Sequence, residues 1–188
     1  LNDRLKFRLT GNHRRYRGYV YNLSTGNWLN GTGDTTVRGK LEWTPGYDWT
    51  VTASGSATRT RSTCCASAVT WVSPGVTFTK AGLPQEMAIG GIAVGADNRV
   101  TRMDVDARGD GRDDGASLRV VRRMGGHSLM SITAVNQYRL DDLQDTDTTD
   151  FDFSTLAPQA PKGGSGNGGY FKIRSTTQEI RLTSPDSG

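Results

Sequence analysis

The sequence has few of the residues that most often identify an active site or a disulfide framework. Its 188 residues include two histidines, His13 and His127, and two cysteines, the neighbours Cys64 and Cys65. With no third cysteine, a conventional intrachain framework is excluded. A bridge between neighbours across a trans peptide would hold the Cα atoms about 3.8 Å apart, below the usual disulfide range. The cysteines therefore indicate neither a compartment nor a redox state.

Long hydrophobic runs and strong helix formers are also scarce. No stretch approaches the roughly 18 consecutive apolar residues of a membrane span, so we expect none. The anions are mostly Asp, with Glu only at Glu42, Glu86 and Glu179, and the cations are mostly Arg. Because Lys and Glu favour exposed helices, their scarcity disfavours helix. No segment keeps an apolar period of 3.6 over three turns.

Short alternating runs of Thr, Val, aromatic and Arg residues are present instead, from one end of the chain to the other. Residues 49–54 read WTVTAS and residues 170–176 read YFKIRST. Alternation with a period of two places successive side chains on opposite faces of an extended strand. The sequence therefore predicts an all-β protein, an antiparallel β-sandwich or jelly-roll-like fold with little or no helix.

Gly, Asp, Asn and Pro divide these runs into expected strands at 5–9, 17–23, 36–42, 49–54, 68–72, 76–80, 87–94, 100–105, 117–122, 128–140 and 170–183. We expect residues 55–67 to form a long loop or an edge strand. Residues 141–169, acidic and then rich in Pro and Gly, are expected to form a long loop or linker. Since one or two returning strands are not stable alone, residues 1–188 are predicted to be a single β domain. The first residue is Leu1 rather than Met, so we expect a processed, excised or internal segment.

The charge balance permits a polyanionic partner. The net charge is +4 and the pI is about 9.3, with cations concentrated in residues 4–17. Arg14, Arg15 and Arg17 are therefore predicted to contact nucleic acid or another polyanion. The alternative is that the high Arg content reflects the composition of the coding sequence.

Aromatic residues are concentrated in the first 71 positions. Trp28 lies between Asn27 and Leu29 in a turn-like region, and is the best candidate for an exposed ring. Together with Trp43 and Tyr47 it is predicted to form a platform for a glycan. The alternative is that the aromatic side chains anchor the core, which we prefer for Trp49 and Trp71.

An acidic segment at 103–115, MDVDARGDGRDDG, is a candidate calcium site. Its carboxylates would supply the oxygen ligands that Ca²⁺ requires, and the candidate ligands are Asp104, Asp106, Asp110, Asp113 and Asp114. Arg108 stands where a third acidic ligand would fall, and the closing Glu of an EF-hand is missing. The alternative is a solvated Asp/Gly turn.

No residue is assigned a catalytic role, because the sequence has no HExxH, CxxC or phosphate-binding GxxxxGK[ST] motif. We expect a non-enzymatic structural or attachment module of a virus or phage particle, such as a capsid, protrusion or tail protein, located in the virion or outside the cell. Its partners would be copies of itself or other particle subunits, with nucleic acid or glycan as further candidates. A secreted carbohydrate-binding β-sandwich is the alternative, and a hydrolase or lyase on a β scaffold is the third.

Overall fold

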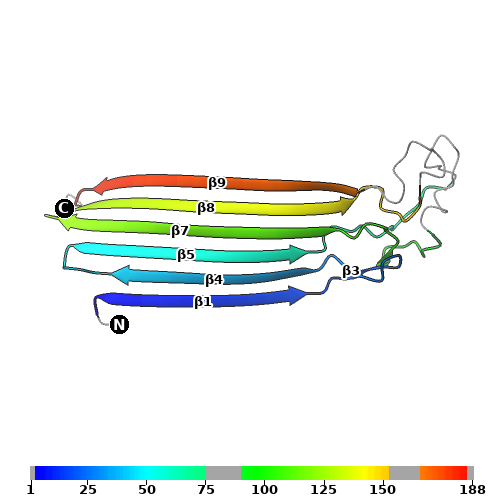
Figure 1. Ribbon diagram of the computed structural model, residues 1–188, viewed down its shortest axis with the longest axis horizontal. Helices are drawn as coiled ribbons and strands as arrows, with labels where there is room; N and C mark the ends of the chain where they lie inside the picture. Colours follow the sequence, from blue (N-terminus) through cyan, green and yellow to red (C-terminus); the bar gives the residue numbers. More distant parts are fainter. Residues whose placement is uncertain (1–2, 75–89, 153–165, 186–188) are drawn as a thin grey trace.

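The computed structural model describes residues 3–74, 90–152 and 166–185, and these form two sheets (Figure 1). Six long antiparallel strands make the larger sheet in the order β1-β4-β5-β7-β8-β9. They are β1 (Leu5–Tyr16), β4 (Thr32–Trp43), β5 (Trp49–Ser62), β7 (Arg108–Met124), β8 (His127–Asp145) and β9 (Gly166–Thr183). Three short strands form the smaller sheet in the order β3-β2-β6: β2 (Val20–Asn22), β3 (Trp28–Leu29) and β6 (Val100–Thr101).

The two ends of the larger sheet differ in how the strands are connected. At one end, which we call the hairpin end, residues 44–48 join β4 to β5 and Gly125-Gly126 join β7 to β8. At the other, the insert end, the chain leaves the sheet after β1 and after β5 to build the smaller sheet, and leaves it again after β8. Figure 1 shows the described parts of these longer connections at the insert end.

The prediction of an all-β fold is confirmed, and no helix occurs in the described residues. The larger sheet is antiparallel as expected, whereas in the smaller sheet β2 pairs with β3 in antiparallel and with β6 in parallel orientation. Strand lengths differ from the expectation. Residues 55–62 belong to β5, which has neighbours on both sides, and the Asp/Gly-rich residues 108–116 are the first half of β7. The strand expected at 68–72 is absent, as is strand structure at 90–94, whereas 76–80 and 87–89 lie outside the described residues. Of 100–105, only Val100–Thr101 are paired.

The predicted loop at 141–169 is shorter at both ends, since β8 continues to Asp145 and β9 starts at Gly166. Residues 153–165 of that segment lie outside the described residues.

The two faces of the larger sheet differ in chemistry. Residues paired across neighbouring strands lie on the same face, so the register assigns every side chain to one face. The face that carries Trp43, which we call the front face, is apolar towards the hairpin end. The back face there carries hydroxyl pairs such as Ser54 with Ser117, whose oxygens are 2.8 Å apart, and charged residues such as Lys6 with Glu42.

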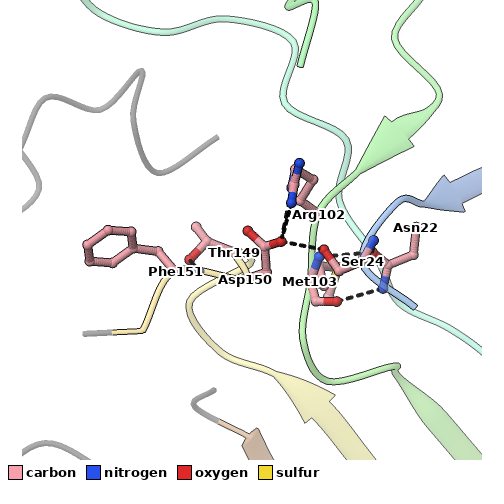
Figure 2. Close-up of polar contacts among 7 residues, drawn as sticks. All are labelled: Asn22, Ser24, Arg102, Met103, Thr149, Asp150 and Phe151. Carbon is pink, nitrogen blue, oxygen red and sulfur yellow. Dashed lines mark hydrogen bonds and ion pairs between the residues drawn. The ribbon is translucent and has the colours of Figure 1, made fainter. Parts of the chain in front are cut away.

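The buried core of the described residues lies at the smaller sheet rather than within the larger one. Val20, Leu29, Ala66 and Met103 pack together there. Asn22 is fully buried beside them, accepts a hydrogen bond from the Met103 amide at 3.0 Å and donates one to the Met103 carbonyl at 2.8 Å (Figure 2). Because each end of the amide is satisfied, a polar side chain is tolerated in this core.

The segment that follows β8 is tied to the same region through Asp150. This carboxylate accepts hydrogen bonds from Ser24 at 2.6 Å and from Arg102 at 2.9 Å (Figure 2). Burial by itself would raise the pKa of Asp150, but the two hydrogen bonds and the charge of Arg102 outweigh it and hold that pKa below its ordinary value. Residues distant in sequence are thereby joined at the insert end.

Cys64 and Cys65 form a disulfide with each other, and the peptide bond between them is cis. The bridge that the sequence analysis disfavoured for a trans peptide is therefore present in the structure. In the part of the chain that the structure describes, no helix has the length and apolar character needed to cross a membrane.

Candidate functional site

An open cleft of about 820 Å³ lies at the insert end, between the front face of the larger sheet and the smaller sheet. Two front-face rows of β1, β4 and β5 line it, one with His13, Thr35 and Arg59 and the next with Arg15, Gly33 and Arg61. Arg17, Asn27 and Trp28 line it from the segment that includes the smaller sheet. The cleft is therefore cationic, with an aromatic ring in its lining.

The indole of Trp28 is fixed by its neighbours. The Arg17 guanidinium carbon lies 4.1 Å from the centre of the indole, and the Tyr21 ring centre lies 5.2 Å away. The adjacent Asn27 donates a hydrogen bond of 2.5 Å to Asp106. Trp28 remains 37% exposed, so it is packed in position but accessible from the cleft.

A row of cations continues from the cleft across the front face. Arg59, Arg112, Arg139 and Lys172 are directly paired on the adjacent strands β5, β7, β8 and β9, and we call them the cationic row. Like charges opposite one another destabilise a sheet, so this arrangement is unfavourable for the protein alone. The charge of Arg174, loss of solvation and the charge of Arg139 lower the pKa of Lys172, in keeping with a positive potential along the row.

A second, smaller hollow of about 230 Å³ lies over this row. It shares Arg59 and Arg61 with the cleft, and extends over Arg112 and Arg139 to Tyr170. Two carboxylates, Asp110 and Asp141, also line it. The Nε atom of Arg139 is buried and has no hydrogen-bond partner among the described residues. The cleft and the hollow are continuous through their shared arginines, and we call them together the basic groove.

The structure brings together three of the residues singled out in the sequence. Arg15, Arg17 and Trp28 all line the cleft. Arg14 lies on the back face, where it donates hydrogen bonds of 3.0 and 2.5 Å to Asp34 and lowers the pKa of that carboxyl. The guanidinium of Arg14 is thus engaged away from the cleft.

The other two aromatic residues of the expected glycan platform lie elsewhere. Trp43 ends β4 and Tyr47, which is 97% exposed, lies in the connection to β5, so both are at the hairpin end. Trp28 is at the insert end, and the three rings therefore do not form one platform.

The five candidate calcium ligands also lie at separate places in the structure and do not form one site. Asp106 accepts hydrogen bonds from Asn22, Thr25 and Asn27 beside the cleft. Asp113 and Asp114 are consecutive residues of β7 and point to opposite faces, with Asp113 accepting a hydrogen bond of 2.8 Å from Asn136. On the front face, Asp110 lies 3.7 Å from Arg61.

Asp104 instead lies near Asp145, the last residue of β8, and Asp147, which follows that strand. Oxygen atoms of Asp104, Asp145 and Asp147 all lie within 4.8 Å of one another, so among the described residues these three carboxylates form a group that could hold a metal ion. Burial, followed by the charge of Asp147, raises the pKa of Asp145 to about 6, against the opposing hydrogen bonds from the Thr148 and Val105 amides. The sequence identified only Asp104 because its partners are about forty residues away in the chain.

The two histidines are far apart in the fold. The Nδ1 atom of His13 lies 2.9 Å from the Thr35 hydroxyl in the cleft. His127 is the first residue of β8, and its Nδ1 atom lies 3.3 Å from the Gly125 carbonyl oxygen at the hairpin end. They do not act on a common centre.

The feature that the sequence did not reveal is the extent of the apolar front face. The apolar side chains of its hairpin-end half, which we call the apolar half, are Leu5, Phe7, Leu9, Val37, Leu41, Trp43, Trp49, Val51, Leu118, Val120, Leu129, Val135, Ile180 and Leu182. One cation, Arg122, lies among them, with its guanidinium carbon 5.1 Å from the centre of the Trp49 ring. Many of the apolar side chains are strongly exposed, including Leu9 at 65% and Ile180 at 72%. Alternation within each strand indicates that one face of that strand is apolar. Only the register between strands shows that the apolar faces of all six strands lie on the same side of the sheet.

Comparison with known proteins finds no match to this chain among protein-family models, curated proteins or solved structures. Function is therefore inferred from the apolar half and the basic groove.

Proposed function

We propose that the protein is a non-enzymatic structural or attachment module, of the kind that builds virus or phage particles, and that two copies associate through the apolar half. The observation that supports this most is the exposure of the apolar half. Within the described residues the larger sheet is a single layer (Figure 1), and many apolar side chains of this face are strongly exposed, so no described element covers it. An exposed apolar surface of this kind marks an interaction site.

The size of the apolar half suits a second copy. It spans five register rows and at its widest six strands, although the row nearest the hairpin end has members only on β5, β7, β8 and β9. With rows about 6.8 Å apart and strands about 4.8 Å apart, it measures roughly 30 Å by 27 Å, or about 800 Å². A specific protein interface of standard size buries about 800 Å² on each partner. Two copies of the apolar half, face to face, therefore supply an interface of the usual extent.

The positive charge of the cationic row favours one orientation of the second copy over the other. If both copies faced each other with their insert ends together, one cationic row would lie on the other, which is unfavourable. A two-fold axis in the interface plane and perpendicular to the strands stacks the apolar halves and sends the two cationic rows to opposite ends. Two such sheets pack about 10 Å apart with their strands roughly aligned. The pair would then be a two-layer sandwich.

The edges of the sheet favour stacking over side-by-side pairing. The outer strands β1 and β9 carry charged residues along their length, among them Lys6, Arg8, Arg174 and Arg181. Charged edge strands resist the addition of a further strand. The face is thus the more suitable surface for association.

Light scattering after size exclusion tests this proposal across micromolar concentrations. We expect a dimer for the unaltered protein. The double variant Leu9→Lys with Val135→Lys places two charges within the apolar half, and should weaken association at least about a hundredfold, because each buried charge would lack a partner.

A matched control uses the next residues on the same strands. Thr10→Lys with Asn136→Lys adds the same charge to the back face, and should leave the dimer intact. A monomer at all concentrations for the unaltered protein would refute the proposal. Equal weakening by both double variants would also refute it, since the apolar half would then have no special part.

A further inference from the structure

We infer that the basic groove binds single-stranded nucleic acid through its phosphate backbone. This site is on the insert-end half of the front face, whereas the proposed dimer uses the hairpin-end half. The inference goes beyond the proposed function and does not depend on it, because the residues of the two surfaces are different.

The first support is the continuity of the groove. It extends from Trp28 across Arg59 and Arg61 to Arg139 and Tyr170, and so crosses the sheet from the β1 side to β9. Six strands about 4.8 Å apart give the sheet a width of about 24 Å between its outer strands. A linear ligand that lies perpendicular to the strands can therefore contact several cations in succession.

The second support is the excess of positive charge. No carboxylate occupies the cationic row itself. The flanking front-face rows contain three carboxylates, Asp110, Asp114 and Asp141, against Arg15, Arg61 and Arg174. Asp106, also at the cleft, already accepts hydrogen bonds from three side chains. Phosphates would relieve the repulsion within the row and release their counterions.

The third support is the aromatic ring at each end. Trp28 lines the cleft and Tyr170, which is 65% exposed, lines the hollow beyond the cationic row. Proteins that bind single strands combine a basic groove with aromatic rings on which bases stack. Arginine also forms planar, paired hydrogen bonds with phosphate oxygens. These rings favour a nucleic acid over a sulfated glycan, which has no bases to stack.

Fluorescence anisotropy with a labelled oligodeoxythymidine of about 20 nucleotides tests the site. We expect saturable binding that weakens as salt rises from about 50 to 200 mM. The double variant Arg59→Ala with Arg112→Ala should weaken binding at least about tenfold and reduce the slope of log K against log salt by about 1.4, or about 0.7 for each lost phosphate contact. Because both positions belong to a row of like charges, the variant should fold at least as stably as the unaltered protein.

The matched control removes the same charge from the back face. Arg8→Ala with Arg38→Ala alters two arginines on β1 and β4, and should change binding less than about twofold. Tyr170→Ala tests the stacking contribution at an exposed position, and should weaken binding about fivefold or more.

Two results would overturn the inference. One is equal weakening by the front-face and back-face double variants, which would indicate attraction by net charge without a groove. The other is tighter binding of a heparin fragment than of the oligonucleotide, with Tyr170→Ala without effect on either, which would identify a sulfated glycan instead. Neither result depends on whether the protein dimerises, since both are read from binding to a labelled probe.

Discussion

At the scale of single residues, the insert end depends on a few polar side chains that are partly or fully buried. Asn22 satisfies both backbone groups of Met103, and Asp150 joins Ser24 to Arg102 (Figure 2). These contacts fix the smaller sheet and the segment after β8, and the smaller sheet in turn carries Trp28 of the basic groove. Loss of one partner would leave others buried without a hydrogen bond.

Asp150→Asn should destabilise the protein by about 1 kcal/mol at neutral pH, because it removes a partly exposed ion pair and a charged hydrogen bond. The pKa of Asp150 is lowered in the folded state, so its contribution is present above the ordinary pKa of about 4 and is lost as pH falls through the folded value. Urea unfolding at several pH values checks this: the difference from the unaltered protein should shrink below about pH 4.

Asp97→Asn is the control, since this exposed residue lies in the loop before β6. It should change the free energy of unfolding by less than about 0.5 kcal/mol at every pH. A difference for Asp150→Asn that stayed constant with pH would contradict the assignment.

Part of the basic groove could be predicted from the sequence, because some of its residues lie close to one another in the chain. Arg15, Arg17 and Trp28 were singled out from composition and turn signals, and the fold keeps them together because β1 leads directly into the smaller sheet. The cationic row could not be predicted in this way. Its four members come from four strands, and their alignment depends on a register that sequence patterns do not specify.

At the scale of elements, local alternation located the strands but underestimated their length. Residues 49–54 alternate clearly and begin β5, whereas RGDGRDDG at 108–115 has turn-like composition and still lies in β7. Hydrogen bonds to β5 and β8 on either side hold that segment extended. Tertiary pairing thus overrides local preference, as expected for the context-dependent propensities of strands.

The junction between the two sheets requires glycine. Gly18 has a φ of 100°, and a Cβ on Gly31 would lie 2.5 Å from the Arg17 carbonyl oxygen. Gly31→Ala should therefore destabilise the protein by about 2 kcal/mol or more, because the backbone must shift at the junction. Urea denaturation measures this loss.

Gly11→Ala is the comparison within β1, where a Cβ would meet nothing within 4 Å. It should be neutral or stabilise the protein by about 0.5 kcal/mol, since alanine loses less backbone entropy than glycine on folding. Equal destabilisation by both variants would mean that the close approach at Gly31 does not matter.

At the scale of the whole molecule, the larger sheet is one layer with two chemically distinct halves on its front face. The apolar half is nearest the hairpin end and the basic groove is nearest the insert end. A stacked pair of copies would bury the first and leave the second open at each end of the assembly. The proposed association and the proposed polyanion binding would therefore use separate parts of one surface.

The central claim is that a second copy covers the apolar half, and hydroxyl-radical footprinting read by mass spectrometry tests it residue by residue. Leu41, Trp43 and Ile180 should be labelled less in the unaltered protein than in the Leu9→Lys, Val135→Lys variant, while exposed back-face residues are labelled equally in both. Equal labelling of the front-face residues in the two proteins would show that nothing covers this face, and would contradict the account.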